Sequence, residues 1–158
     1  QTWQNLRGQK LVIVGDVRHS RVAASHLELA KLCGIELAFC GPKEFLPALT
    51  LDTDIKIFSD LSAALSWADA VMALRVQFER HGSGMTISKE DYRHQFGLTV
   101  AAMKNFKASG LILHPGPVNH GIEMDTEVLA DPRSLVLEQV SSGVFVREAL
   151  LRWMGGLA

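Results

Sequence analysis

Short apolar runs alternate along the chain with segments whose hydrophobic residues recur at helical spacing. Five of these runs are typical of buried strands, and the third, which is short, is expected at an edge of the sheet. The runs cover residues 10–16, 35–42, 54–60, 70–75 and 110–116, with 134–139 as a sixth and shorter candidate. Helical spacing covers residues 20–33, 60–68, 98–107 and 140–154.

This order of elements predicts the fold class. Strands that alternate with helices form a mainly parallel sheet with helices on both faces. We therefore expect an α/β, Rossmann-like three-layer sandwich in which residues 1–158 form a single domain. The polar stretch 79–97 is long for a connection in a compact domain, and such connections are usually functional or mobile.

In a sheet of this kind, ligands bind beyond the carboxyl ends of the strands. The first such end is VGDVRHSR, residues 14–21, which has one glycine and so lacks the Gly-x-Gly-x-x-Gly turn of a dinucleotide site. Arg21 stands at the start of the following helix, where free N–H groups favour an anion. A bound carboxylate or phosphate would explain this arginine, and a solvated surface side chain is the alternative.

The second strand end is MALRVQFER, residues 72–80. Arg75 and Gln77 are two positions apart, so their side chains point to the same side of an extended chain. An arginine can hold a carboxylate through two parallel N–H donors, and a glutamine amide both donates and accepts. The pair favours a ligand with carboxylates and an amine, and a charge cluster on an edge strand is the alternative.

The third strand end is LHPGPVNHG, residues 113–121. Pro115 and Pro117 lack an N–H and fix φ, and the residues that precede them, His114 and Gly116, are expected to be extended. A stiff strip with carbonyl acceptors and few donors would suit an ammonium or NH2 group, whereas a rigid turn out of the sheet is the alternative. Together, the three ends predict a pocket for a small molecule with one or two carboxylates and an amine.

Composition and charge disfavour other classes of function. The formal net charge is −1, from 16 Lys and Arg against 17 Asp and Glu, so we expect no binding to nucleic acid or an anionic membrane. No apolar run approaches the roughly 20 residues of a membrane span, and the first residues do not resemble a signal or transit peptide. Cys33 and Cys40 have no metal-type spacing. We expect buried thiols in a reducing cytoplasm, with no metal and no cofactor.

The three segments, in this order, resemble the C-terminal half of aspartate transcarbamoylase catalytic chains. The motifs VIVGDVRHSRVAAS, MALRVQFER, FGLT, LHPGPVNHGIE and QVSSGVFVREALL carry the resemblance, which covers nearly the whole chain. It implies the aspartate-binding domain of an enzyme that transfers the carbamoyl group of carbamoyl phosphate to L-aspartate in pyrimidine synthesis. His120 departs from the pattern, because many bacterial relatives have arginine at this position.

The resemblance implies a role for each candidate residue. Arg21 and Arg75 would hold the aspartate carboxylates, and Gln77 would support them. Glu79 and Arg80 would form ion pairs within the loop that follows. The positively charged side-chain ammonium of ornithine would not pair with Arg75. Ornithine transcarbamoylases resemble this fold but have an HCLP-type segment in place of HPGP.

The same resemblance assigns the proline-rich strip. The carbonyls of Pro115 and Gly116 would face the reacting amine and the carbamoyl NH2. Gly116 and Pro117, joined by a cis peptide, would border the carbamoyl phosphate. Residues 79–97 would be a mobile loop that closes on substrate.

The family's Ser-x-Arg-Thr-Arg motif and its carbonyl-polarising histidine are absent from this sequence. We expect these catalytic groups on a carbamoyl-phosphate-binding domain, so that this chain alone folds but is inactive and the full-length protein is a homotrimer. The last helix, 140–154, would pack on that domain through its apolar residues. Two alternatives stay open, namely a transcarbamoylase for another amine and a non-catalytic carboxylate-binding or assembly module.

Overall fold

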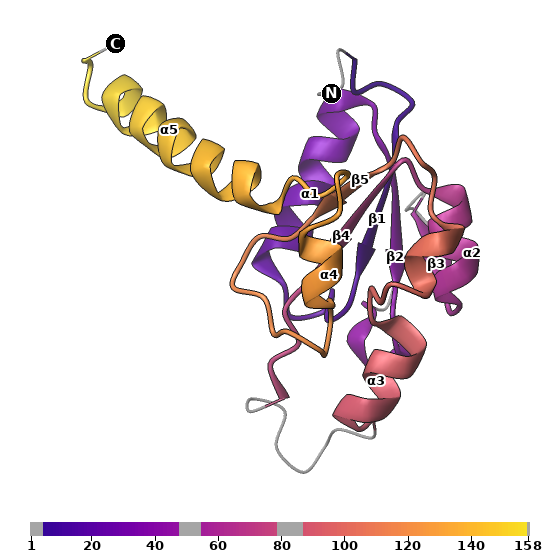
Figure 1. The fold of residues 1–158 in the computed structure, drawn as a ribbon. Helices are drawn as coiled ribbons and strands as arrows, with labels where there is room; N and C mark the ends of the chain where they lie inside the picture. The colour runs from indigo at the N-terminus through magenta and orange to yellow at the C-terminus, as the bar shows by residue number, and fades with distance from the viewer. Residues whose placement is uncertain (1–4, 48–54, 79–86, 158) are drawn as a thin grey trace.

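A computed structural model describes residues 5–47, 55–78 and 87–157 of the chain. Its centre is a five-stranded, all-parallel sheet in the order β3-β2-β1-β4-β5 (Figure 1). The strands are Lys10–Val14 (β1), Glu36–Cys40 (β2), Lys56–Phe58 (β3), Ala70–Ala73 (β4) and Leu111–Leu113 (β5). The predicted parallel α/β sheet is confirmed, and β3 lies at an edge as expected.

Helices cover both faces of this sheet. The helical segments are α1 (Arg21–Cys33), η1 (Lys43–Phe45), α2 (Leu61–Trp67), α3 (Lys89–Phe96), η4 (Ala102–Asn105), α4 (Thr126–Leu129) and α5 (Val136–Met154). The α1 helix packs on one face, and α2, α3 and η4 contribute to the hydrophobic core on the other. The arrangement is the predicted three-layer sandwich.

The central strand β1 shows why the strand runs are apolar without interruption. Successive strand residues face opposite sides of a sheet. Val12 and Val14 therefore enter the core under α2, whereas Leu11 and Ile13 enter the core under α1. A strand covered on both faces needs an apolar side chain at every position.

The helix boundaries follow local chemistry. Ser20 precedes α1, and its hydroxyl accepts a hydrogen bond from the Ala23 N–H at 3.2 Å. Asp60 caps α2 in the same way through the Ala63 N–H at 2.8 Å. Each cap satisfies an N–H group that the first helical turn leaves unpaired. Gly34 ends α1 with a φ of +69°, a conformation that glycine adopts without strain.

Two expectations about the later elements are wrong. Residues 134–139 do not form a sixth strand, because Ser134 makes only an isolated bridge to Ile112 and α5 begins at Val136 rather than at residue 140. A short apolar run fits a strand and a buried helix start equally well. Residues 98–107 do not form an α-helix either. Leu98 is held in an extended bridge to Met124, which leaves only η4 helical in this stretch.

The polar stretch 79–97 is partly ordered as a helix. Its second half forms α3, whose start is capped by Ser88 through the Asp91 N–H at 3.0 Å. Tyr92 and Phe96 on this helix are buried in the main core. Residues 79–86 lie outside the described part of the chain, so the expected ion pairs of Glu79 and Arg80 stay predictions.

The last helix, α5, extends away from the sandwich (Figure 1). Val136 in its first turn is buried, whereas the five apolar residues predicted to face another domain are exposed. These residues are Val144, Phe145, Leu150, Leu151 and Trp153. Among the helices that the structure describes, none is long and apolar enough to cross a membrane.

The two cysteines differ in environment. Cys40, at the end of β2, is fully buried as predicted, whereas Cys33 is only partly buried because it ends α1 beside the Gly34 cap. Burial raises the pKa of the Cys40 thiol to about 12, and the negative charge of Asp60 adds to this effect.

We expect iodoacetamide to leave Cys40 unmodified in the folded protein near pH 8. The reactive form is the thiolate, and a pKa of about 12 lowers its population by roughly a thousandfold relative to an ordinary cysteine. Mass spectrometry of tryptic peptides, alkylated in native buffer and in urea, measures both rates. Equal alkylation of Cys40 under the two conditions would contradict this environment.

Candidate functional site

The order of the strands reverses between β1 and β4. The chain adds β2 and β3 on one side of β1, and then β4 and β5 on the other. Connections that leave neighbouring strands in opposite directions open a crevice at the carboxyl ends, where α/β proteins bind ligands. The segments that follow β1, β4 and β5 meet at this crevice.

A cavity of about 200 Å³ lies there. Five of the six residues predicted from the sequence line it together: Arg75, Gln77, Pro115, Gly116 and Pro117. The remaining lining residues were not singled out as site residues: Asp16, His19, Ser20, Val22 and Leu74. Residues from three separate strand ends therefore share one small cavity.

Arg21 does not line this cavity. It is the first residue of α1 and is exposed, although its neighbours Ser20 and Val22 both reach the cavity wall. The residue therefore lies next to the site along the chain, and its predicted contact with a carboxylate stays a prediction.

Arg75 and Gln77 are presented by extended chain beyond the end of β4. The residues that alternate with them are buried: Val76 has no exposed surface, and Leu74 is 3% exposed. This alternation directs the two polar side chains to the same side, as the spacing predicted. The Asn119 amide nitrogen donates a hydrogen bond to the Val76 carbonyl at 3.1 Å, which attaches this stretch to the proline-rich loop.

The proline-rich strip differs from the expectation at Gly116. This residue has a φ of +72°, not the extended conformation predicted for a residue before proline, and its peptide bond to Pro117 is cis. A glycine adopts positive φ because it has no Cβ. The Gly116 N–H points back and donates to Nδ1 of His114 at 2.8 Å.

The strip at residues 115–117 presents its carbonyl groups as hydrogen-bond acceptors. No described residue donates a hydrogen bond to the carbonyl oxygen of Pro115 or Gly116. The one N–H of the strip, at Gly116, is occupied by His114. The strip therefore offers acceptors and no donor, as the two prolines predicted.

Asp16 is a buried acid in the turn after β1. Its carboxylate accepts hydrogen bonds from the His19 N–H at 3.3 Å and pairs with the His19 ring at 2.9 Å. Aspartate often binds backbone N–H groups a few residues further along a turn. That spacing, Asp-x-x-His, was the available signal for this part of the site.

Tyr92 is buried in the core near the turn after β1, and it lies in the stretch that was expected to be a loop. Burial raises the pKa of its hydroxyl well above the usual value, and the electrostatic effects of the nearby acidic groups, Glu123 first, act in the same direction. The phenol therefore stays protonated. A Cβ on Gly15 would lie 3.1 Å from this hydroxyl, a tight contact, and the φ of +122° at this position also favours glycine.

The polar groups of the cavity are suited to holding a charged ligand. Across the described ranges, no group of three His, Cys, Asp or Glu side chains could hold a metal ion. His114 faces Glu123, and His120 is exposed and contacts Thr126, so neither histidine points to a shared metal position. A guanidinium, an amide and carbonyl groups can bind and orient a ligand with carboxylates and an amine.

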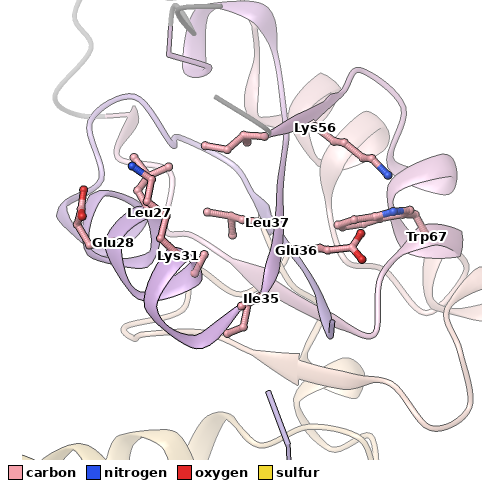
Figure 2. A pocket seen from close by; sticks show the side chains of 11 residues that line it. Leu27, Glu28, Lys31, Ile35, Glu36, Leu37, Lys56 and Trp67 are labelled. Atoms are coloured by element: carbon pink, nitrogen blue, oxygen red, sulfur yellow. The ribbon is translucent and has the colours of Figure 1, made fainter. Parts of the chain in front are cut away.

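A larger cavity of about 450 Å³ lies at the opposite, amino-terminal end of the sheet. In Figure 2, the apolar side chains of Leu27, Ile35 and Leu37 line this cavity together with charged residues such as Lys31 and with Trp67. None of the predicted site residues takes part in it. Size alone would have selected a cavity that contains none of the residues predicted from the sequence.

The chain is similar to aspartate carbamoyltransferase catalytic subunits. It is 43% identical over 152 residues to the subunit of Gemmatimonas aurantiaca and 44% identical over 151 residues to that of Myxococcus xanthus. The alignments include 96% of this chain in both cases, but 48% and 51% of the relatives. The chain therefore spans about half the length of these curated relatives.

Solved structures show the same fold. The ornithine carbamoyltransferase of Thermus thermophilus superposes with a TM-score of 0.71 at 26% identity, over 87% of this chain and 45% of that one. The Pyrococcus furiosus enzyme of the same name has a TM-score of 0.79 at 19% identity, over 94% and 50%.

A family of domains described as "Aspartate/ornithine carbamoyltransferase, Asp/Orn binding domain" matches residues 7–154. The resemblance to aspartate transcarbamoylase catalytic chains, predicted from the motifs, is confirmed by the relatives above. Because the match spans nearly the whole chain, this protein belongs to the Asp/Orn-binding domain family of the aspartate and ornithine carbamoyltransferases.

Proposed function

We propose that the chain is the aspartate-binding half of an aspartate transcarbamoylase, which transfers the carbamoyl group of carbamoyl phosphate to L-aspartate. One observation carries the proposal. Arg75 and Gln77 share a cavity with Pro115 and Gly116. The N–H groups of Arg75 and Gln77 can donate hydrogen bonds to carboxylates, and the carbonyls of Pro115 and Gly116 can accept them from an amine. A ligand that carries both kinds of group is an α-amino dicarboxylate.

In this reaction, the aspartate nitrogen attacks the carbonyl carbon of carbamoyl phosphate. A C–N bond forms, the bond from that carbon to the phosphate oxygen breaks, and the amine loses a proton as phosphate leaves. The carboxylate contacts of Arg75 and Gln77 hold aspartate, with Arg21 beside them. The carbonyls of Pro115 and Gly116 orient the amine and the carbamoyl NH2. Orientation of this kind removes much of the entropic barrier to a two-substrate reaction.

Aspartate fits the site better than ornithine does. Arg75 is a fixed positive charge on the cavity wall, and the ammonium group of ornithine would be repelled by it. The side-chain carboxylate of aspartate would instead form a pair of charged hydrogen bonds. The relatives at 43% and 44% identity carry the aspartate name.

The groups that stabilise the developing oxyanion are proposed to lie on a carbamoyl-phosphate-binding domain. The last helix supplies a surface for that domain, because Phe145 is 69% exposed and Trp153 is 71% exposed. Contiguous apolar surface of this kind marks an interface. Assembly of the full-length protein into a homotrimer belongs to the same proposal. So does a place in the reducing cytoplasm, which the free thiols of Cys33 and Cys40 support.

Replacing Arg75 with alanine tests the carboxylate clamp. We expect kcat/KM for aspartate to fall roughly a hundredfold or more in the assembled enzyme, because a charged, bidentate contact is lost. The KM for carbamoyl phosphate should change little. Steady-state kinetics with each substrate varied in turn measures both values.

Arg7→Ala is the matched control for this experiment. Arg7 is exposed and contacts Gly34 at the amino-terminal end of the sheet, far from the cavity. Its loss should leave the kinetics unchanged. Normal aspartate kinetics in Arg75→Ala would show that the clamp is assigned to the wrong residue.

Complementation tests the division of labour between the halves. We expect this chain alone to form no carbamoyl-aspartate, because the groups that stabilise the oxyanion are proposed to lie on the carbamoyl-phosphate-binding domain. Mixing it with the remaining half of the Myxococcus xanthus catalytic chain should restore product from aspartate and none from ornithine. A colorimetric ureido assay measures both products.

The other outcomes of this mixing experiment separate the alternatives. Turnover by this chain alone would disprove the division of labour. Product from ornithine would identify a transcarbamoylase for another amine. No product from either amine, with the two halves associated, would favour a non-catalytic carboxylate-binding module.

A further inference from the structure

A connection through Asn119 and Glu123 links the two walls of the cavity. It consists of three hydrogen bonds and one close contact between Glu123 and His114. Resting on the function proposed above, we propose that this connection positions the carbonyl strip relative to the carboxylate clamp and so sets the affinity for aspartate. Asn119 and Glu123 act here as positioning residues, because neither lines the cavity.

Glu123 is the centre of the connection. Its side chain has no exposed surface, and neither has that of His114. Acidic side chains are almost never fully buried unless they are paired. A buried acid at this position therefore needs a reason in the surrounding contacts.

The first branch runs from Glu123 to the carbonyl strip. Oε1 of Glu123 faces Nε2 of His114 at 3.5 Å. Nδ1 of the same ring accepts the Gly116 N–H at 2.8 Å, so Nε2 is the ring nitrogen on the Glu123 side, close to the carboxylate but without a hydrogen bond to it. The ring orientation that holds Gly116 is thus the one that an acid beside Nε2 favours.

The second branch runs from Glu123 to the clamp. Oε1 accepts the Asn119 N–H at 2.6 Å, and the Asn119 side-chain amide donates to the Val76 carbonyl at 3.1 Å. Val76 lies between Arg75 and Gln77 in the sequence, and its side chain is completely buried. The position of the clamp therefore depends on Glu123, which also contacts the histidine that holds the strip.

The two walls contact different parts of aspartate. The clamp holds carboxylates and the strip receives the amine, so a shift of one wall relative to the other would misplace the nitrogen even with both walls intact. Small displacements of this kind are costly in two-substrate reactions. A ligand with carboxylates but no amine would be less sensitive to such a shift.

Asn119→Ala is the test variant. It removes the side-chain bond to Val76 and keeps the backbone N–H that binds Glu123, and Asn119 is only partly buried, so the fold should survive. In the assembled enzyme, we expect KM for aspartate to rise roughly fivefold or more, as for the loss of one hydrogen bond. The KM for carbamoyl phosphate and the inhibition constant of succinate should change by less than about half that factor.

Asn105→Ala is the matched control. The Asn105 amide also donates a side-chain hydrogen bond, to the Ser62 hydroxyl at 3.2 Å, but it lies on η4 away from the cavity. Its loss should affect the melting temperature at most. This comparison separates a loss of stability from a loss of positioning.

Two variants at Glu123 examine the centre of the connection. Glu123→Gln keeps an oxygen acceptor for the Asn119 N–H and should stay near the parent KM for aspartate. Glu123→Leu removes the acceptor and should raise that KM at least as much as Asn119→Ala. Because Glu123→Leu alters a fully buried position, Asn119→Ala decides the question if the leucine variant does not fold.

The outcomes distinguish this proposal from the function on which it rests. If the parent assembly forms no carbamoyl-aspartate, the proposed function is wrong and the positioning role falls with it. If the parent is active and Asn119→Ala leaves KM for aspartate unchanged, only the positioning role is wrong. Equal losses for aspartate and succinate would also overturn it, because the bond would then order the clamp alone.

Discussion

The pairing of β1 with β4 is the constraint on which the site depends. The two strands are parallel and in register from Leu11 opposite Ala70 to Val14 opposite Ala73. One further hydrogen bond, from the Leu74 N–H to the Val14 carbonyl at 2.8 Å, extends this pairing. The two chains therefore leave the sheet side by side. Since strand order reverses between these strands, the turn after β1 and the clamp after β4 necessarily open into one crevice.

The rest of the sandwich supports that edge. Apolar residues on both faces of β1 bury the sheet under α1 and α2, and Tyr92 of α3 is part of the core on the α2 side. The β5 strand pairs with β4 as far as Leu113, which delivers His114 and the following strip to the clamp. A rigid scaffold with variable loops at its carboxyl edge is how α/β folds place binding groups.

Much of this arrangement can be predicted from local patterns in the sequence. The apolar runs, the caps at Ser20 and Asp60, and the alternation at Arg75 and Gln77 depend on neighbours within a few residues, so they can be read without a fold. Element type failed where a run was short or polar. The segment 134–139 satisfies both a strand and a helix, and α3 was hidden because its sequence is mostly polar.

By itself, the sequence determined the parallel α/β class, the three strand ends with unusual chemistry, and the family resemblance, because each is written in contiguous residues. Only the tertiary structure decided that Arg75, Gln77 and the strip share a cavity from which Arg21 is set aside. It also decided that Gly116 turns back to His114 and that Glu123 and Asn119 connect the two walls. These contacts join residues from different strand ends, and strand order, which no local pattern encodes, brings those ends together.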